Sequence, residues 1–400
     1  MCRRLHALSY SLHVVLRRLA PLLVATALLF AWAGQAGGAP APPVAAKAVL
    51  VGDGKTGEIL FERNAEARVP MASITKLMTA LVTLENRRPD DVVTVHGPAP
   101  SIGESTIQLR AGEKLPVGDL LAAALIQSAN DAAYALASEV GDGSVPTFVA
   151  LMNAKARELG LADTRYARPD GLDTPAHYSS AEDTFALART AMARPVVRRL
   201  VRMRRADIAG GRTVRTWNDL LATFPGLNGV KTGHTDRAGW SEVASARRDG
   251  TNVYAVILGR PNRAQRNADL AKLLEWGFDQ YGRVTFIREG QRYATTAVPF
   301  SEERVELVAL GSADDVIRLR PGTRFEERVV APAMVDLPVR RGQRLGEVIV
   351  TDGDRVVARQ PLVATRSVAE PSFGDRVGWY ADRTLDEAGS MLANVFGAIG

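Results

Sequence analysis

Apolar residues recur with two different periods along this 400-residue chain. Helical spacing predicts a helix that begins within 71–78 and further helices at 115–128, 131–140, 148–159, 181–193 and 262–281. Shorter runs predict strands at 48–52, 56–61, 91–95, 229–233, 240–247 and 252–258. Because helices lie both between and after the strands, we expect an α/β (α+β) layered domain, with a mostly antiparallel sheet flanked by helices.

A different pattern begins near residue 286. Short alternating runs continue to residue 371 and predict a small all-β domain, which we interpret as a pedestal or spacer. Its clearest hairpin signal is the turn Thr351-Asp-Gly-Asp354 between the predicted strands 347–350 and 356–359. No residues in this part form a credible catalytic cluster, so we expect the chemistry to reside before it.

Residues 375–399 carry a single apolar stripe and predict an amphipathic C-terminal helix. Interfacial helices usually carry Lys and Arg on the polar face, whereas here Arg376 and Arg383 are outnumbered by four acidic residues. Peripheral contact with a membrane through 375–399 and docking on a protein surface therefore both stay open.

The N-terminal segment has the three-part pattern of a signal peptide. Basic residues come first, the apolar run 19–33 follows, and small residues fill 34–39. We expect cleavage near Ala36 and export to the cell envelope, because the run is shorter than a membrane span of roughly 20 residues. An uncleaved anchor at the outer face of the cytoplasmic membrane is the alternative. The predicted parts are a signal peptide (1–36), a main domain (37–285), a β-rich domain (286–371) and a helical tail (372–400).

Charge and cysteine content exclude several classes of function. The net charge is +6, but without the four arginines of the leader 46 basic residues face 44 acidic ones, so we do not expect nucleic acid as a partner. The only cysteine, Cys2, precedes the apolar run, which leaves the mature chain without thiol chemistry. The three histidines beyond the leader lack ligand-like spacing. We therefore expect no metal and no other cofactor.

Candidate chemistry begins with Ser73 and Lys76 in the helix that starts within 71–78. Residues three positions apart lie on one helix face, so the hydroxyl and the amine can meet. A neutral lysine can take the proton of a serine and thereby activate it as a nucleophile. Taken alone, such a pair is more often a helix cap with a solvent-exposed lysine.

Two further motifs follow, Ser128-Ala-Asn130 and Lys231-Thr-Gly233. The chain contains only 7 lysines against 43 arginines, yet two of the seven fill the positions where an amine is required. Ser-x-x-Lys, Ser-x-Asn and Lys-Thr-Gly in this order are the motif set of serine β-lactamases and penicillin-binding proteins.

The chain resembles low-molecular-mass penicillin-binding proteins of the serine-type D-alanyl-D-alanine carboxypeptidase family over most of residues 45–370. The similarity extends beyond the motifs to 58–64, 126–131 and 231–239. This family has a β-lactamase-like catalytic domain, a β-rich second domain and often an amphipathic C-terminal anchor. The chain departs from the family pattern at Arg168-Pro-Asp-Gly-Leu172, near the expected substrate cleft.

The resemblance implies acyl transfer to a serine and release of the terminal D-alanine from peptidoglycan stem peptides. It implies that β-lactams act as covalent inhibitors. Ser73 is the expected nucleophile and Lys76 the expected base. Ser128 would pass a proton to the leaving amine. Asn130 would bind Lys76 through its carbonyl and the substrate amide through its NH₂ group.

A second set of residues is expected to bind the substrate. Lys231 and Thr232 would bind the terminal carboxylate, with Arg266 near it by resemblance to the family. Gly233 would let a peptide pair along the strand edge. The backbone N–H groups of Ser73 and His234 are the oxyanion donors that the resemblance implies. The imidazole of His234 has no predicted role in proton transfer.

Three alternatives stay open from the sequence. A β-lactamase would share the fold and the motifs but would need a dedicated deacylating carboxylate. A DD-endopeptidase would cut cross-links with the same residues. A non-catalytic wall-binding scaffold would not need the intact motif residues.

Overall fold

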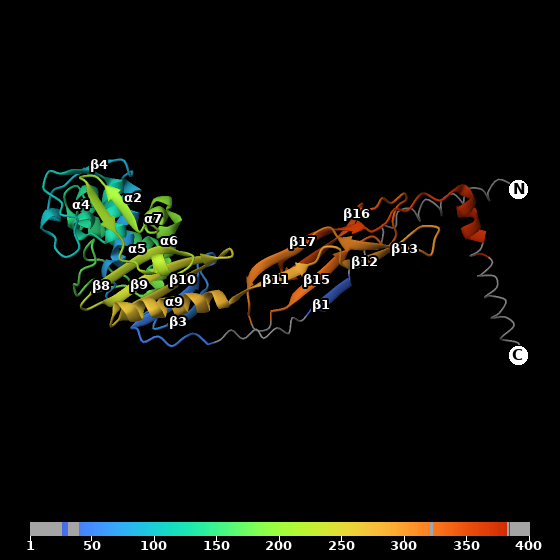
Figure 1. Cartoon of the computed structure of the whole chain (residues 1–400), viewed down its shortest axis with the longest axis horizontal. Coiled ribbons are helices and arrows are strands. Elements are labelled where there is room, and N and C mark those ends of the chain that lie inside the picture. The colour runs from blue at the N-terminus through green and yellow to red at the C-terminus, as the bar shows by residue number, and fades with distance from the viewer. Residues whose placement is uncertain (1–25, 31–39, 321–322, 382–383, 385–400) are drawn as a thin grey trace, which may run out of the picture. The chain divides into compact units, whose positions relative to one another are not determined.

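The computed structural model describes residues 26–30, 40–320, 323–381 and 384 (Figure 1). The chain divides into two compact units, one formed by Gly38–Tyr281 and the other by Met1–Gly37 with Gly282–Gly400. No helix among the described residues is long and apolar enough to cross a membrane.

The first unit is built on a five-stranded antiparallel sheet with the order β3-β2-β10-β9-β8. The strands are β2 (Ala48–Asp53), β3 (Ile59–Arg63), β8 (Leu227–Thr235), β9 (Gly239–Arg248) and β10 (Thr251–Arg260). This confirms the predicted mixed fold with an antiparallel sheet. Since β8 lies at the edge of this sheet, the Lys-Thr-Gly segment borders the space beside it.

Both faces of the sheet are buried because residues of alternate parity face two different helical layers. Val49 and Ile257 pack against α9 (Arg263–Asp279), which crosses one face in Figure 1. Leu50 and Val256 belong to the opposite core, which a second layer of helices covers.

That second layer contains α2 (Lys76–Asn86), α3 (Val117–Ala122), α4 (Asn130–Val140), α5 (Val145–Glu158), α6 (Ala181–Ala193) and α7 (Pro195–Leu200). Shorter elements join them: the 3₁₀ turns η2 (Ala72–Thr75) and η3 (Ala99–Ser101), the π turn η4 (Ala123–Gln127), α8 (Leu220–Thr223) and the strand pairs β4 (Val92–Thr94) with β5 (Lys114–Pro116) and β6 (Arg205–Ile208) with β7 (Arg212–Arg215).

One local prediction needs correction. The helix expected over 115–128 changes to the π turn η4, and Ser128 follows in a left-handed conformation with φ +68°. After α6 the chain is helical only as far as Leu200, and Arg205 begins β6. Gly210 and Gly211, with φ of +75° and +68°, form the turn that folds β6 back on β7.

The second unit contains a six-stranded antiparallel sheet with the order β1-β15-β16-β17-β13-β12. The strands are β1 (Thr26–Phe30), β12 (Arg292–Ala297), β13 (Arg304–Ala309), β15 (Phe325–Val330), β16 (Arg344–Asp352) and β17 (Arg355–Ala364), while β11 (Tyr281–Ile287) pairs with β14 (Ala313–Arg318). The predicted hairpin at Thr351–Asp354 joins β16 to β17, with Asp352 opposite Arg355.

The two chain ends are only partly described. Within the predicted leader, Thr26–Phe30 forms β1 beside β15, and residues 1–25 and 31–36 lie outside the described residues. At the other end residues 373–381 are helical. Most of the predicted helix 375–399 lies beyond the described part, so both the leader and the tail stay predictions.

The packing of the sheet against α9 leads to a stability prediction. Ile257 is fully buried in this core, whereas Val92 of the same unit is 60% exposed. We expect Ile257→Ala to lower the free energy of unfolding by about 2–5 kcal/mol, because it removes buried methyl groups and leaves a cavity. Urea titration followed by tryptophan fluorescence measures this change. Val92→Ala is the control, and an equal effect of both variants would contradict the packing.

Candidate active site

Ser73 lies in the turn η2 (the nucleophile turn), and α2 begins at Lys76. The turn is tightly enclosed. Ala72 adopts φ +50°, and a Cβ on Gly171 would lie 2.0 Å from the carbonyl oxygen of Ala72. A Cβ on Gly233 would lie 3.1 Å from the Ser73 nitrogen. Glycine at both positions therefore lets two other segments approach the backbone of the nucleophile turn.

Lys76 connects three segments of the site. Its fully buried Nζ donates hydrogen bonds of 2.7 Å to Ser73 Oγ, to Asn130 Oδ1 and to the carbonyl oxygen of Asp170. Burial lowers the pKa of Lys76 to about 8, while the negative charges of Asp170 and Glu104 oppose this shift. The neutral amine is therefore far more populated near neutral pH than that of an ordinary lysine, and it contacts the hydroxyl that it would deprotonate.

Lys231 and Ser128 form a second pair of amine and hydroxyl. Lys231 Nζ donates to Ser128 Oγ at 2.8 Å and to the carbonyl oxygen of Thr232 at 2.9 Å. Burial lowers the pKa of Lys231, as does the positive charge of Lys76, whereas the Glu242 carboxylate raises it. The left-handed backbone of Ser128 turns the chain between η4 and α4 at this contact.

Successive residues of β8 serve opposite faces of the sheet. Lys231 is paired with Val243 and extends toward Ser128 in the helical layer. Thr232 is paired with Glu242, on the face where α9 brings Arg266. The strand geometry thus places the side chains of Lys231 and Arg266 on opposite faces of the sheet.

Asn130, at the start of α4, anchors a neighbouring loop. Its Oδ1 accepts from Lys76 as predicted, and its Nδ2 donates to the carbonyl oxygen of Gly103 at 3.1 Å. Its backbone N–H donates to the carbonyl oxygen of Ser105 at 2.7 Å. The predicted contact of the Asn130 NH₂ group with a substrate amide stays a prediction.

These groups surround a cavity of ≈ 220 Å³. Seven of the nine predicted site residues line it, and Lys76 and Lys231 lie behind them. The lining residues are Ser73, Glu104, Ser105, Ser128, Asn130, Trp217, Thr232, Gly233, His234, Trp240 and Arg266. The structure therefore brings all three motifs and the start of α9 to one place.

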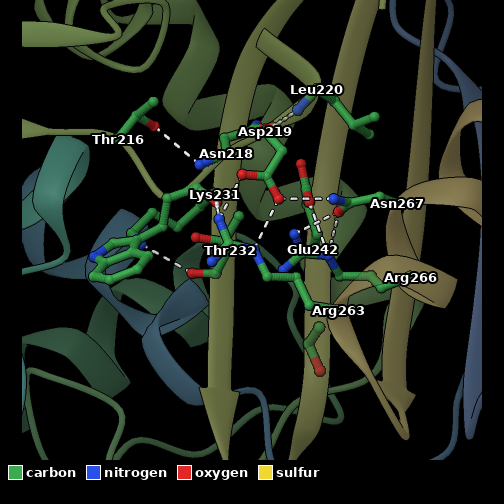
Figure 2. Close-up of polar contacts among 12 residues, drawn as sticks. Thr216, Asn218, Asp219, Leu220, Lys231, Thr232, Glu242, Arg263, Arg266 and Asn267 are labelled. Atoms are coloured by element: carbon green, nitrogen blue, oxygen red, sulfur yellow. Dashed lines mark hydrogen bonds and ion pairs between the residues drawn. The ribbon is translucent and has the colours of Figure 1, made fainter. Parts of the chain in front are cut away.

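A polar network that is buried at Arg266 and Glu242 and partly exposed at Asp219 and Arg263 supports Arg266 (Figure 2). Arg266 and Glu242 are nearly inaccessible and form an ion pair, with 3.1 Å between Nε and Oε2. Arg266 also donates to Asn267 Oδ1, and Asn267 donates to Asp219. Asp219 in turn accepts two hydrogen bonds from Arg263. The network holds the guanidinium of Arg266 at the cavity wall.

Aromatic rings complete this wall. The rings of His234 and Trp240 stack with centroids 4.0 Å apart, and the guanidinium of Arg266 lies 5.8 Å from the Trp240 ring. Trp217 is half exposed, and Arg263 lies over its ring at 5.4 Å. The imidazole of His234 is therefore engaged in stacking, while its backbone remains on β8.

His177 supports the nucleophile turn. Its Nδ1 accepts from the backbone N–H of Ala167, and its Nε2 lies 2.7 Å from Thr75 Oγ1. Thr75 Oγ1 also donates to the carbonyl oxygen of Ala72. Burial lowers the pKa of His177 to about 4, so the ring is neutral and its Nε2–H donates to Thr75. These hydrogen bonds connect His177 through Thr75 to Ala72 and so hold the nucleophile turn in place.

Five residues of the site were not predicted from the sequence: Glu104, Ser105, Trp217, Trp240 and Glu242. Glu242 could have been noticed in the sequence, since it is the one acidic residue of the predicted strand 240–247. Trp217 and Glu104 lie in segments without periodic pattern. Their position became visible only when the loops were placed around the cavity.

Comparisons with known proteins agree with this geometry. Residues 35–262 match a family model described as D-alanyl-D-alanine carboxypeptidase. The chain is 31% identical to the D-alanyl-D-alanine carboxypeptidase DacD of Salmonella typhimurium over 379 residues, covering 90% of this chain and 94% of that protein. It is 29% identical to DacF of Bacillus subtilis, covering 82% and 87%.

Solved structures show the same similarity. Penicillin binding protein 5 from Haemophilus influenzae matches with a TM-score of 0.60 and 27% identity, covering 83% of this chain and all of that one. Penicillin-Binding Protein D2 from Listeria monocytogenes, in its ampicillin-bound form, matches with a TM-score of 0.55 and 32% identity, covering 60% of this chain and all of that one.

The buried acid gives a pH-dependent stability prediction. Burial raises the pKa of Glu242 to about 7, so the folded state holds this proton more tightly than the unfolded state. The resulting stabilisation is present below the ordinary carboxyl pKa and is lost as the pH rises through about 7. Relative to Glu242→Gln, we expect the wild type to lose about 1–3 kcal/mol of unfolding free energy between pH 4.5 and 8.

Glu275 provides the matched control for this measurement. Its hydrogen bond and ion pair with Arg248 lower its pKa, so Glu275→Gln should give a pH dependence of opposite sign. Urea titrations of the three proteins across the pH range measure both. The same slope for both substitutions would show that the Glu242 carboxyl is not perturbed by burial.

Proposed function

Since the chain belongs to the D-alanyl-D-alanine carboxypeptidase family, we propose that it removes the terminal D-alanine of peptidoglycan stem peptides through an ester on Ser73. The observation that supports these roles most directly is the 2.7 Å contact of Lys76 Nζ with Ser73 Oγ beside the cavity. It joins a hydroxyl to a buried amine of lowered pKa.

In the first step, neutral Lys76 takes the proton of Ser73, and Oγ attacks the carbonyl carbon of the D-Ala-D-Ala bond. The backbone N–H groups of Ser73 and His234 stabilise the negative oxygen that forms. Family resemblance supports this pair, and so does the closeness of Gly233, the residue before His234, to the Ser73 nitrogen. Each such donor typically contributes about 10²–10³ in rate.

In the next step, Ser128 delivers a proton to the leaving nitrogen, and the C–N bond breaks. Its contact with Lys231 Nζ supports this role, because the lysine can resupply the proton. Water then hydrolyses the ester and regenerates Ser73. Asn130 keeps Lys76 oriented throughout, through the hydrogen bond to Oδ1.

The terminal carboxylate of the peptide binds at the side of the cavity that Thr232 and Arg266 line. Lys231 lies behind this side. A hydroxyl and a guanidinium are suitable donors to a carboxylate. The edge position of β8 supports pairing of an extended substrate along this strand.

A β-lactam would acylate the same serine, because its strained amide offers the same carbonyl to Ser73. The family places the enzyme outside the cytoplasm, at the cell wall. We further propose that residues 1–36 are its leader, 37–285 its catalytic domain, 286–371 a β-rich spacer and 372–400 a helical tail. Peripheral membrane contact through 375–399 belongs to the same proposal.

Removal of the nucleophile tests the proposal directly. We expect Ser73→Ala to reduce D-alanine release from a Lys-D-Ala-D-Ala peptide at least about 10³-fold, and to abolish the covalent penicillin adduct. Released D-alanine and intact-protein mass spectrometry measure the two effects. Ser101→Ala, an exposed serine of the same unit, is the control. A penicillin adduct that survives in Ser73→Ala would overturn the assignment.

The pKa of Lys76 predicts the pH dependence of acylation. As a base, Lys76 must be neutral, so the rate of penicillin acylation should rise with pH and level off above about 8. Stopped-flow measurement between pH 6 and 9.5 gives this profile. Lys76→Arg should acylate far more slowly across the range, because a guanidinium stays protonated. A wild-type rate that falls through this interval would exclude Lys76 as the base.

A further inference from the structure

One acidic side chain lines the catalytic cavity, that of Glu104. It is exposed, and it makes no ion pair or side-chain hydrogen bond that involves the described residues. The mechanism above gives it no role. Glu104 is therefore not a buried structural acid. Its accessible carboxylate faces the space that the substrate would occupy.

The backbone around Glu104 is fixed by the catalytic Asn130. The side-chain NH₂ of Asn130 donates to the carbonyl oxygen of Gly103, and its backbone N–H donates to that of Ser105. Ser105 Oγ also donates to the carbonyl oxygen of Gln127 at 3.0 Å. Glu104 itself adopts φ +64°, a conformation that glycine adopts more readily, so the backbone does not explain a glutamate here.

The charges around the cavity are separated. Arg266 lines one side and Lys231 lies behind it, where the terminal carboxylate is proposed to bind. Glu104 lies on the side of Asn130, and its charge raises the pKa of Lys76. Arg168, whose pKa the charge of Glu104 helps to raise, is already paired with Asp170 through two hydrogen bonds of 2.6 and 2.9 Å. The Glu104 carboxylate thus remains available to a cation of the substrate.

We propose that Glu104 binds the side-chain ammonium of the diamino acid that precedes D-Ala-D-Ala, and so selects stem peptides whose amine is free. This rests on the proposed function. A lysine-type ammonium sits on a flexible four-carbon stem, which suits a contact away from the scissile bond. The peptide then presents a carboxylate to Arg266 and an ammonium to Glu104, complementary to the cavity.

A different role for the same carboxylate makes a contrasting prediction. If Glu104 activated the water that hydrolyses the ester, its removal would slow every peptide alike. Ammonium binding instead changes only the preference between peptides that differ in this one charge. The ratio of two kcat/KM values within one enzyme is therefore the decisive readout, and it is insensitive to general effects on catalysis.

The experiment compares Nα-acetyl-Lys-D-Ala-D-Ala with its Nα,Nε-diacetyl counterpart, following D-alanine release by purified protein. We expect the wild type to favour the free amine about three- to tenfold, the range of an ion pair between exposed and partly desolvated. Glu104→Gln should remove this preference. Glu104→Lys should instead favour a third peptide, in which an Nε-succinyl group replaces the ammonium with a carboxylate. Added salt should weaken the wild-type preference. Glu66→Gln, an exposed glutamate outside the cavity, should retain it.

Each outcome bears on one proposal. Equal kcat/KM of the wild type for both peptides, or an equal slowing of both by Glu104→Gln, would overturn ammonium binding while leaving carboxypeptidase activity in place. Release of D-alanine from neither peptide by the wild type would instead overturn the proposed function itself.

Discussion

The site depends on one buried amine. Lys76 has no exposure to solvent, and an amine in such a place is tolerated only when its hydrogens are bound. Its three acceptors come from three separate segments, namely Ser73, Asn130 and the backbone of Asp170. The same contacts that satisfy Lys76 therefore fix the position of the nucleophile, and burial gives Lys76 the lowered pKa that a base needs. The burial of Lys76 therefore accounts both for the contacts that join the three segments and for its lowered pKa.

The tight fit around Ser73 follows from this constraint. The nucleophile turn must stand within reach of Lys76 while β8 and the segment at Gly171 press on its backbone. Only glycine fits at Gly171 and Gly233, where a Cβ would meet backbone atoms at 2.0 and 2.9 Å. The neutral ring of His177 then holds Thr75 through a hydrogen bond of 2.7 Å. Each of these contacts limits the movement of the nucleophile turn.

The sequence predicted the elements whose hydrophobic period is clear, and it predicted the motif residues because their chemistry is specific. It placed Ser73, Lys76, Ser128, Asn130 and Lys231 in one cleft, as the structure does. It could not predict the left-handed Ser128, because the helical pattern continues through 115–128. It also missed Glu104, since a single glutamate in an aperiodic loop resembles any solvated residue until Asn130 is seen to bind both neighbours. Long-range contacts decide such positions, and local pattern does not contain them.

Charge balance connects the two sides of the cavity. Lys76, Lys231 and Arg266 are all buried. Glu242 forms an ion pair with Arg266, and its charge raises the pKa of Lys231. Burial lowers the pKa of both lysines and raises that of Glu242, so the cavity resists full ionisation of its own groups. Under the proposed mechanism, an arriving carboxylate would supply negative charge beside Arg266 and Lys231 and favour their charged forms. Lys76, the proposed base, contacts Ser73 instead. The charge of the substrate would thus assign Lys231 to binding and leave Lys76 to proton transfer.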